Sequence, residues 1–67
     1  MFIGLDKIDG SPVYINVNKI SAIEDDNKRK GICNVWMQGA EEVWCIRGSA
    51  LNVMKAAEKE YENKRSG

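Results

Sequence analysis

Residues 32–46 read Ile32-Cys33-Asn34-Val35-Trp36-Met37-Gln38-Gly39-Ala40-Glu41-Glu42-Val43-Trp44-Cys45-Ile46, two strand-like runs around a short polar segment. β-branched and aromatic residues fill both runs, so we expect an antiparallel hairpin with strands at about 31–37 and 41–46. A three-residue loop, 38–40, places Met37 opposite Glu41, Val35 opposite Val43, and Cys33 opposite Cys45. Two other registers are compatible with the sequence, because a one-residue change in loop length shifts the pairing.

The three-residue loop sorts the side chains of this hairpin onto two faces. One face receives Cys33, Val35, Met37, Val43 and Cys45. The other receives four large apolar residues, together with Asn34 and Glu42. A single helix covers only one face of a small sheet, so the second face is a candidate protein-binding or dimer surface. Its predicted protein-binding residues are Trp36, Trp44, Ile46 and Ile32. The alternative is that both tryptophans cover the core, as a small domain requires.

The segment before this hairpin predicts three further strands, at about 2–8, 12–17 and 20–24. Asp9-Gly10 favours a two-residue hairpin turn in which both central residues take positive φ. In the second strand, Val13 and Ile15 fall on one face and Tyr14 on the other, the period of two expected of a half-buried strand.

Residues 25–31 carry acidic and then basic side chains without an apolar residue, which is typical of an exposed loop. In the simpler interpretation the opposite charges partly cancel in a solvated loop tip. In the other, Lys28, Arg29 and Lys30 form a basic docking patch.

A helix is predicted over about 50–63, with the Ser49 hydroxyl as its N-terminal cap. Apolar residues recur there at helical spacing and form one stripe. These are Ala50, Val53, Met54, Ala57 and Tyr61. The expected fold class is therefore α+β, a small curled antiparallel sheet of about five strands followed by one C-terminal α-helix. The 67 residues leave room for a single domain, 1–67, whose small core favours an oligomer.

Composition narrows the function classes. Ten basic and ten acidic residues give a formal charge of zero, which argues against nucleic acid as the main partner. The chain has no histidine, and no phosphate-binding loop or metal-ligand spacing occurs, so we expect no enzyme activity, no cofactor and no metal site. Without a signal peptide or membrane span, a cytoplasmic protein is expected, in which Cys33 and Cys45 are free thiols in the core.

A resemblance to a known family rests on Leu5-Asp6-Lys7-Ile8-Asp9-Gly10-Ser11-Pro12-Val13-Tyr14-Ile15-Asn16, followed by Ile20-Ser21-Ala22-Ile23-Glu24. This pattern resembles the opening of small flagellar and swarming-motility proteins of the FlbD type. Beyond residue 24 only the order of elements agrees, Val17 stands where that family usually has proline, and the tryptophan-rich hairpin differs. The resemblance implies a cytoplasmic accessory factor of bacterial motility, without catalytic residues.

The sequence thus predicts a non-enzymatic protein-interaction domain whose partner is another protein, including a second copy of the chain. Two alternatives stay open. One is a phage or mobile-element protein that binds and modulates a host complex, and the other is a small nucleic-acid-binding regulator that uses the basic patch.

Overall fold

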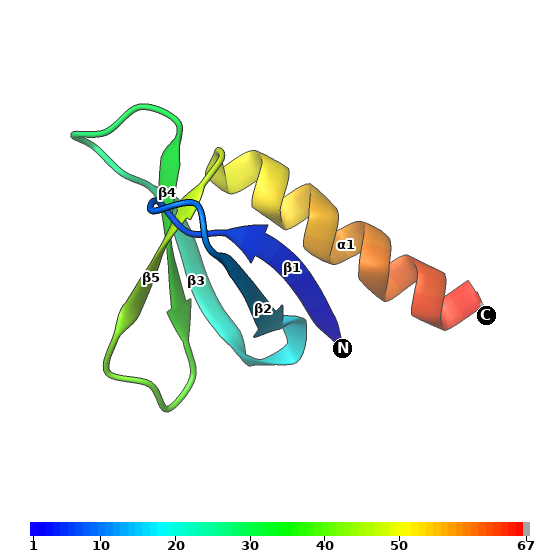
Figure 1. The fold of residues 1–67 in the computed structure, drawn as a ribbon. Coiled ribbons are helices and arrows are strands. Elements are labelled where there is room, and N and C mark those ends of the chain that lie inside the picture. Colours follow the sequence, from blue (N-terminus) through cyan, green and yellow to red (C-terminus); the bar gives the residue numbers. More distant parts are fainter. Residues whose placement is uncertain (67) are drawn as a thin grey trace.

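The computed structural model describes the backbone of residues 1–66 and the side chains of residues 1–60. The strands and helices follow the predicted order, and the α+β class with five antiparallel strands and a C-terminal helix is confirmed (Figure 1). Among the described residues, no helix is long and apolar enough to cross a membrane. The elements are β1 (Phe2–Asp6), β2 (Pro12–Asn16), the 3-10 helix η1 (Val17–Lys19), β3 (Ile20–Asp25), β4 (Ile32–Met37), β5 (Val43–Arg47) and α1 (Ala50–Ser66).

The strands form two sheets instead of the single curled sheet that the sequence predicts. β1 pairs only with β2, and β3, β4 and β5 form a separate sheet in that order. One isolated bridge joins Lys7, the residue after β1, to Ile46 of β5. β2 and β3 are joined by η1, where the Asn16 side chain accepts a hydrogen bond from the Asn18 amide, so the chain turns there and leaves the ladder.

The turn between β1 and β2 has three residues, so the predicted two-residue turn is wrong. The Lys7 amide donates to the Ser11 carbonyl and the Gly10 amide to the Lys7 carbonyl, each at 2.9 Å. Within this turn, Gly10 alone takes a positive φ, at 91°. Asp9 avoids the left-handed region, which is costly for a residue with a Cβ, and its Oδ1 instead accepts hydrogen bonds from Ser11.

The register of β4 and β5 differs by one residue from the predicted one. Val35 lies opposite Trp44, Trp36 opposite Val43, and Cys33 opposite Ile46. The connection spans residues 38–42 and turns at Gly39, which has a φ of 77°. Because side chains alternate between faces, the shift moves Trp44 and Ile46 to the face of Val35 and moves Val43 and Cys45 to the opposite face.

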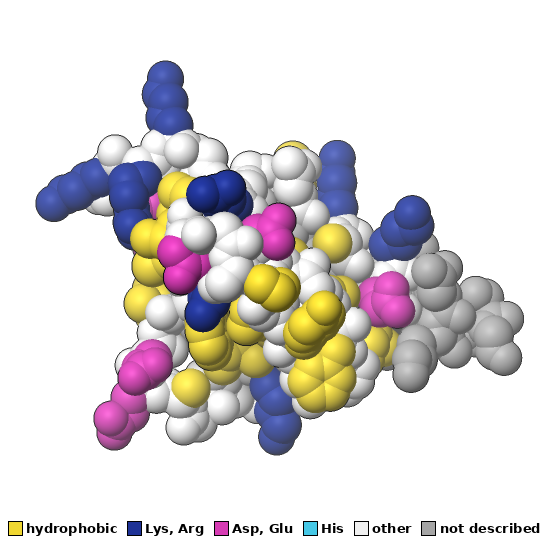
Figure 2. Space-filling view, viewed as in Figure 1, with side chains coloured by type: hydrophobic (Ala, Val, Ile, Leu, Met, Phe, Trp, Pro, Cys, Tyr) yellow, Lys and Arg dark blue, Asp and Glu magenta, His cyan; other side chains and the backbone are white. Residues whose placement is uncertain are grey.

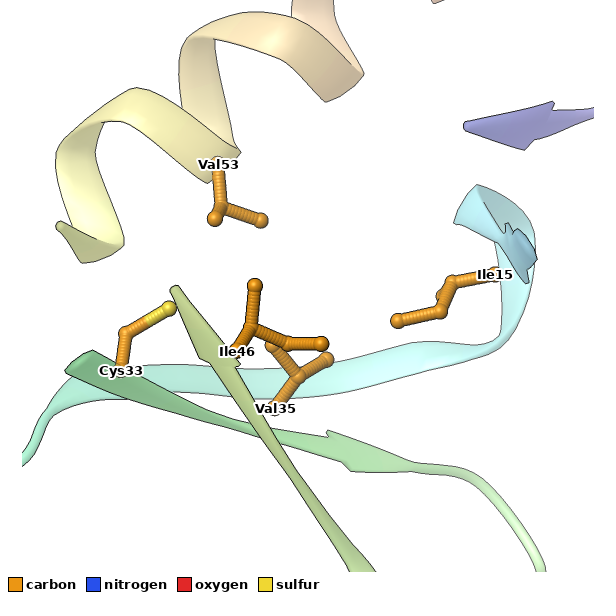
Figure 3. Packing of buried hydrophobic residues seen from close by; sticks show 5 residues of the cluster. All are labelled: Ile15, Cys33, Val35, Ile46 and Val53. Atoms are coloured by element: carbon orange, nitrogen blue, oxygen red, sulfur yellow. The ribbon is translucent and has the colours of Figure 1, made fainter. Parts of the chain in front are cut away.

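The core lies between the three-stranded sheet, the β1–β2 hairpin and α1. Val53 is the buried residue among positions 50–60 of the helix, and it projects toward Ile46 and Cys33 of the sheet (Figure 3). Leu5, Val13, Trp44 and Ala50 are among the half-buried residues around this cluster. Among residues 1–60, the buried residues are Ile3, Ile15, Cys33, Val35, Ile46 and Val53.

The helix departs from its predicted apolar stripe at one position. Val53 is buried and Ala50 and Ala57 are half-buried, as expected, whereas Met54 is exposed. In the described part of the helix, a narrow strip around Val53 meets the sheet, and the neighbouring Met54 faces solvent. The predicted contact of Tyr61 lies outside the described side chains.

Candidate surface for protein binding

The four predicted protein-binding residues do not share a face. Ile46 is fully buried, at 0% exposure, and Trp44 packs against the core beneath Lys7, whose Nζ lies 5.7 Å from the ring centroid. Trp36 and Ile32 project from the opposite side of the sheet, where Trp36 is exposed and Ile32 half-buried. The predicted surface of four apolar residues is therefore wrong, and Ile46 and Trp44 are structural.

We call the side of the β3–β4–β5 sheet that faces away from the helix the outer face. Three apolar residues lie in register across it, and we call them the outer row: Ala22, Trp36 and Val43. All three are exposed, Trp36 at 36% and Val43 at 40%. Each comes from a different strand, so the row crosses the full width of the sheet.

An irregularity in β3 places Ala22 in this row. Ile20 lies opposite Met37 and Ala22 opposite Trp36, so Ser21 is an extra residue in the ladder. The Ser21 hydroxyl donates a hydrogen bond to the Trp36 carbonyl at 3.1 Å. Without this bulge, alternation would keep Ala22 on the inner face together with Ile20.

The remainder of the outer face is mostly polar. Its central row consists of Glu24, Asn34 and Cys45, and its far row pairs Ile32 with Arg47. The Arg29 guanidinium reaches back from the β3–β4 loop to Asp26, at 2.8 Å, and to the Cys45 thiol, at 3.6 Å. This arginine therefore covers part of the outer face at the end opposite the outer row.

In the charged β3–β4 loop, several hydrogen-bond donors surround the carboxylate of Asp26. The hydrogen bond from the Arg29 side chain, followed by those from the Lys28 and Arg29 amides, holds the pKa of Asp26 well below its usual range. The same pairing raises the pKa of Arg29. Lys28, Arg29 and Lys30 are all exposed, as predicted, and the expected charge cancellation is confirmed at Asp26 and Arg29. A docking role for the three basic residues stays a prediction.

Charge is unevenly distributed between the two ends of the three-stranded sheet. Figure 2 shows Lys and Arg side chains gathered at the end of the molecule where the β3–β4 loop lies in Figure 1, and acidic side chains at the tip of the β4–β5 loop. The basic end carries Lys28, Arg29, Lys30 and Arg47. The acidic end carries Glu41 and Glu42, with Lys19 nearby through the hydrogen bond from the Gln38 amide to the Lys19 carbonyl.

A second exposed apolar surface, which the sequence reasoning missed, lies on the β1–β2 hairpin. Phe2 and Tyr14 are exposed, and hydrophobic side chains are visible over β1 and β2 in Figure 2. A Cβ placed on Gly4, the residue opposite Tyr14, would lie only 3.1 Å from the tyrosine ring. The Tyr14 ring therefore packs over the backbone of Gly4, which has no side chain, and this contact gives Tyr14 a structural role. The alternation of Tyr14 with the inward-facing Val13 and Ile15 was the available signal.

The two cysteines occupy different environments. Cys33 is buried in the core, and burial, followed by the charge of Asp25, raises the pKa of its thiol. Cys45 is half-buried on the outer face, so the expectation that both lie in the core is wrong for Cys45. Both thiols are free.

No group of three or more His, Cys, Asp or Glu side chains that could hold a metal ion occurs among residues 1–60. No protein-family model matches the chain, and neither curated proteins nor solved structures give a significant match.

Proposed function

We propose that this chain is a non-enzymatic protein-interaction domain that binds through the outer face of its three-stranded sheet. The observation that carries the proposal is the outer row, in which Ala22, Trp36 and Val43 lie in register and exposed across three strands. Exposed tryptophan beside aliphatic residues is the composition of a binding hot spot.

The chemistry of the remaining surface is compatible with binding and offers little for catalysis. The chain has no histidine, and the one strongly shifted carboxylate among residues 1–60, Asp26, is held in its ionised form by neighbouring donors in the loop. A carboxylate with a lowered pKa is a poor general base near neutral pH.

Site-specific photo-crosslinking in the native cells tests this function. A photoreactive amino acid in place of Val43 should give discrete protein adducts, at least about fivefold above those from Glu58 on the exposed side of the helix. Trp36→Ser in the same chain should abolish them, with circular dichroism confirming that the variant is folded. Equal yields from the two positions, or adducts that survive Trp36→Ser, would contradict the proposal.

The biological context that we propose is an accessory role in bacterial motility. The support is the resemblance of residues 5–16 and 20–24 to FlbD-type proteins, segments that form the β1–β2 hairpin and β3 here. The alternative is a phage or mobile-element protein that modulates a host complex. Neighbouring genes for flagellar parts support the first, and neighbouring phage genes support the second.

Nucleic-acid binding through Lys28, Arg29 and Lys30 is the remaining alternative. The Arg29 guanidinium is already paired with Asp26, which leaves two lysines in the loop for phosphate contacts. A salt titration against generic DNA and RNA tests this function, because phosphate contacts give an affinity that falls steeply with salt.

A further inference from the structure

We infer that the outer face binds a second copy of this chain, with the two sheets stacked face to face and their strands antiparallel. The inference rests on the proposed function, because it names the partner of the same surface. Stacked sheets lie about 10 Å apart with strand directions within about 30° of each other. A two-fold axis that lies between the two sheets and runs perpendicular to the strands satisfies this geometry and makes the contact self-complementary.

The charges of the two loops favour this arrangement. Lys28 and Lys30 lie in the loop at one end of the sheet, and Glu41 and Glu42 lie in the loop at the other end. Reversing the strand direction of the second copy brings the basic loop of each chain opposite the acidic loop of the other. Stacking with parallel strands would place like charges together, which costs binding free energy.

The side chains of the outer face fit the same axis. Trp36 and Ile32 lie four residues apart on β4, about 13 Å at the usual rise per residue. An axis along the central row, through Asn34, places Trp36 of each chain over Ile32 of the second copy. Asp26 lies next to Ile32, because its amide donates to the Ile32 carbonyl at 2.9 Å, and the Arg29 guanidinium paired with Asp26 can stack favourably on an aromatic ring.

The contact is small, so the dimer is weak. Three strands of five or six residues form the whole face, less than the area of a standard interface. Glu24, in the central row, would also meet Glu24 of the second copy near the axis. The dimer should therefore form at high micromolar concentration and depend on salt.

Reversing the charges of the two loops by substitution is the decisive experiment. Light scattering from about 10 µM to about 1 mM, in low salt, measures the dissociation constant of the full chain. Lys28→Glu with Lys30→Glu, and separately Glu41→Lys with Glu42→Lys, should each weaken the dimer at least about tenfold, because each puts like charges together at both loop contacts. The chain with all four substitutions should return to within about threefold of the wild type. These side chains are exposed, so the variants should fold.

The axis itself is tested at Cys45, which lies in the central row. A bis-maleimide spanning about 10 Å should join two chains through Cys45, and Cys45→Ser should remove the product. The Cys33 thiol is fully buried and should not react. Trp36→Ser should weaken the dimer at least about tenfold, whereas Leu51→Ser, on an exposed helix position, should not.

A wild type that stays monomeric up to about 1 mM overturns the inference. So does a quadruple variant whose dimer is no tighter than the dimers of the two double variants. The photo-crosslinking at position 43 separates this failure from failure of the proposed function. Adducts with a different protein, together with a monomeric chain, reject the second copy as partner and leave the binding surface standing. Absence of any adduct rejects both.

Discussion

Asp26 organises the β3–β4 loop through one carboxylate. Its Oδ1 accepts hydrogen bonds from the Lys28 and Arg29 amides at 2.8 and 2.9 Å. Its Oδ2 accepts from the Arg29 guanidinium, at 2.8 Å, and from the Asn34 side chain. These donors stabilise the ionised carboxylate, so the loop depends on the charge of this residue.

Asp26→Asn should therefore lower the melting temperature at neutral pH, and the difference from the wild type should shrink in acid. The folded-state pKa lies below the unfolded value of 3.8, so the contribution to stability is complete above that value. It is lost as pH falls below about 4 toward the folded pKa. Thermal unfolding of both chains from about pH 7 to about pH 2 measures this. Glu58→Gln is the control, and a pH-independent difference at Asp26 would show that the charge is irrelevant.

The sequence predicts the charge cancellation in this loop but not which carboxylate provides it. Asp25 and Asp26 are adjacent and chemically identical. Strand alternation decides their roles, because Asp25 lies opposite Cys33 on the inner face whereas Asp26 turns to the outer face and meets Arg29. That choice depends on the register of β3, which the bulge at Ser21 sets.

At the scale of elements, the start of α1 is fixed from two directions. The Ser49 hydroxyl accepts from the Asn52 amide at 3.1 Å, the predicted cap. The Asp25 carboxylate, from β3, accepts from the Ala50 amide at 2.7 Å. A negative charge also suits the N-terminal end of a helix. The second contact joins the helix to the sheet, and no local pattern predicts it because 25 residues separate the two.

Ser49→Ala and Asp25→Ala should each lower the free energy of unfolding by about 1 kcal/mol, since each leaves an amide of the first turn unsatisfied. Asp25→Asn keeps an acceptor and should cost less than Asp25→Ala. Urea unfolding followed by circular dichroism measures all three. Equal losses for the Asn and Ala variants would mean that the carboxylate charge, and not the acceptor, stabilises the helix.

The register of β4 and β5 was one element-scale prediction that failed, although the strands themselves were placed within two residues. Both faces of β5 read as apolar over residues 43–46, so alternation alone does not choose between them. Arg47 was the unused signal, because it shares the phase of Val43 and Cys45 and is exposed in the structure. An exposed arginine at that end of the strand indicates that its phase faces outward.

At the scale of the whole molecule, six buried side chains within the described residues 1–60 form the core beneath five strands and a helix. Ile46 is at its centre, between Val53 of the helix and Cys33 and Val35 of the sheet (Figure 3). So small a core leaves little stability to lose.

Ile46→Val should therefore lower the free energy of unfolding by about 1 kcal/mol, and Ile46→Ala by about 2–5 kcal/mol, enough to unfold much of the chain. Leu51→Ala is the matched control, because Leu51 is 57% exposed and its change should stay within about 0.5 kcal/mol. Urea unfolding at one protein concentration gives these values. If Leu51→Ala lowered the free energy of unfolding as much as Ile46→Val does, the result would contradict the placement of the core.

The proposed dimer makes its own prediction at Glu24. This carboxylate is exposed in the central row of the outer face, and the two-fold axis brings it near the same residue of the second copy. Glu24→Gln should remove a repulsion and tighten the dimer about two- to fivefold in low salt, with the gain disappearing near 1 M salt, where exposed charges are screened. Light scattering with Glu58→Gln as control measures the effect. A weaker dimer, or a salt-independent gain, would place Glu24 away from the axis and require a different stacking of the two sheets.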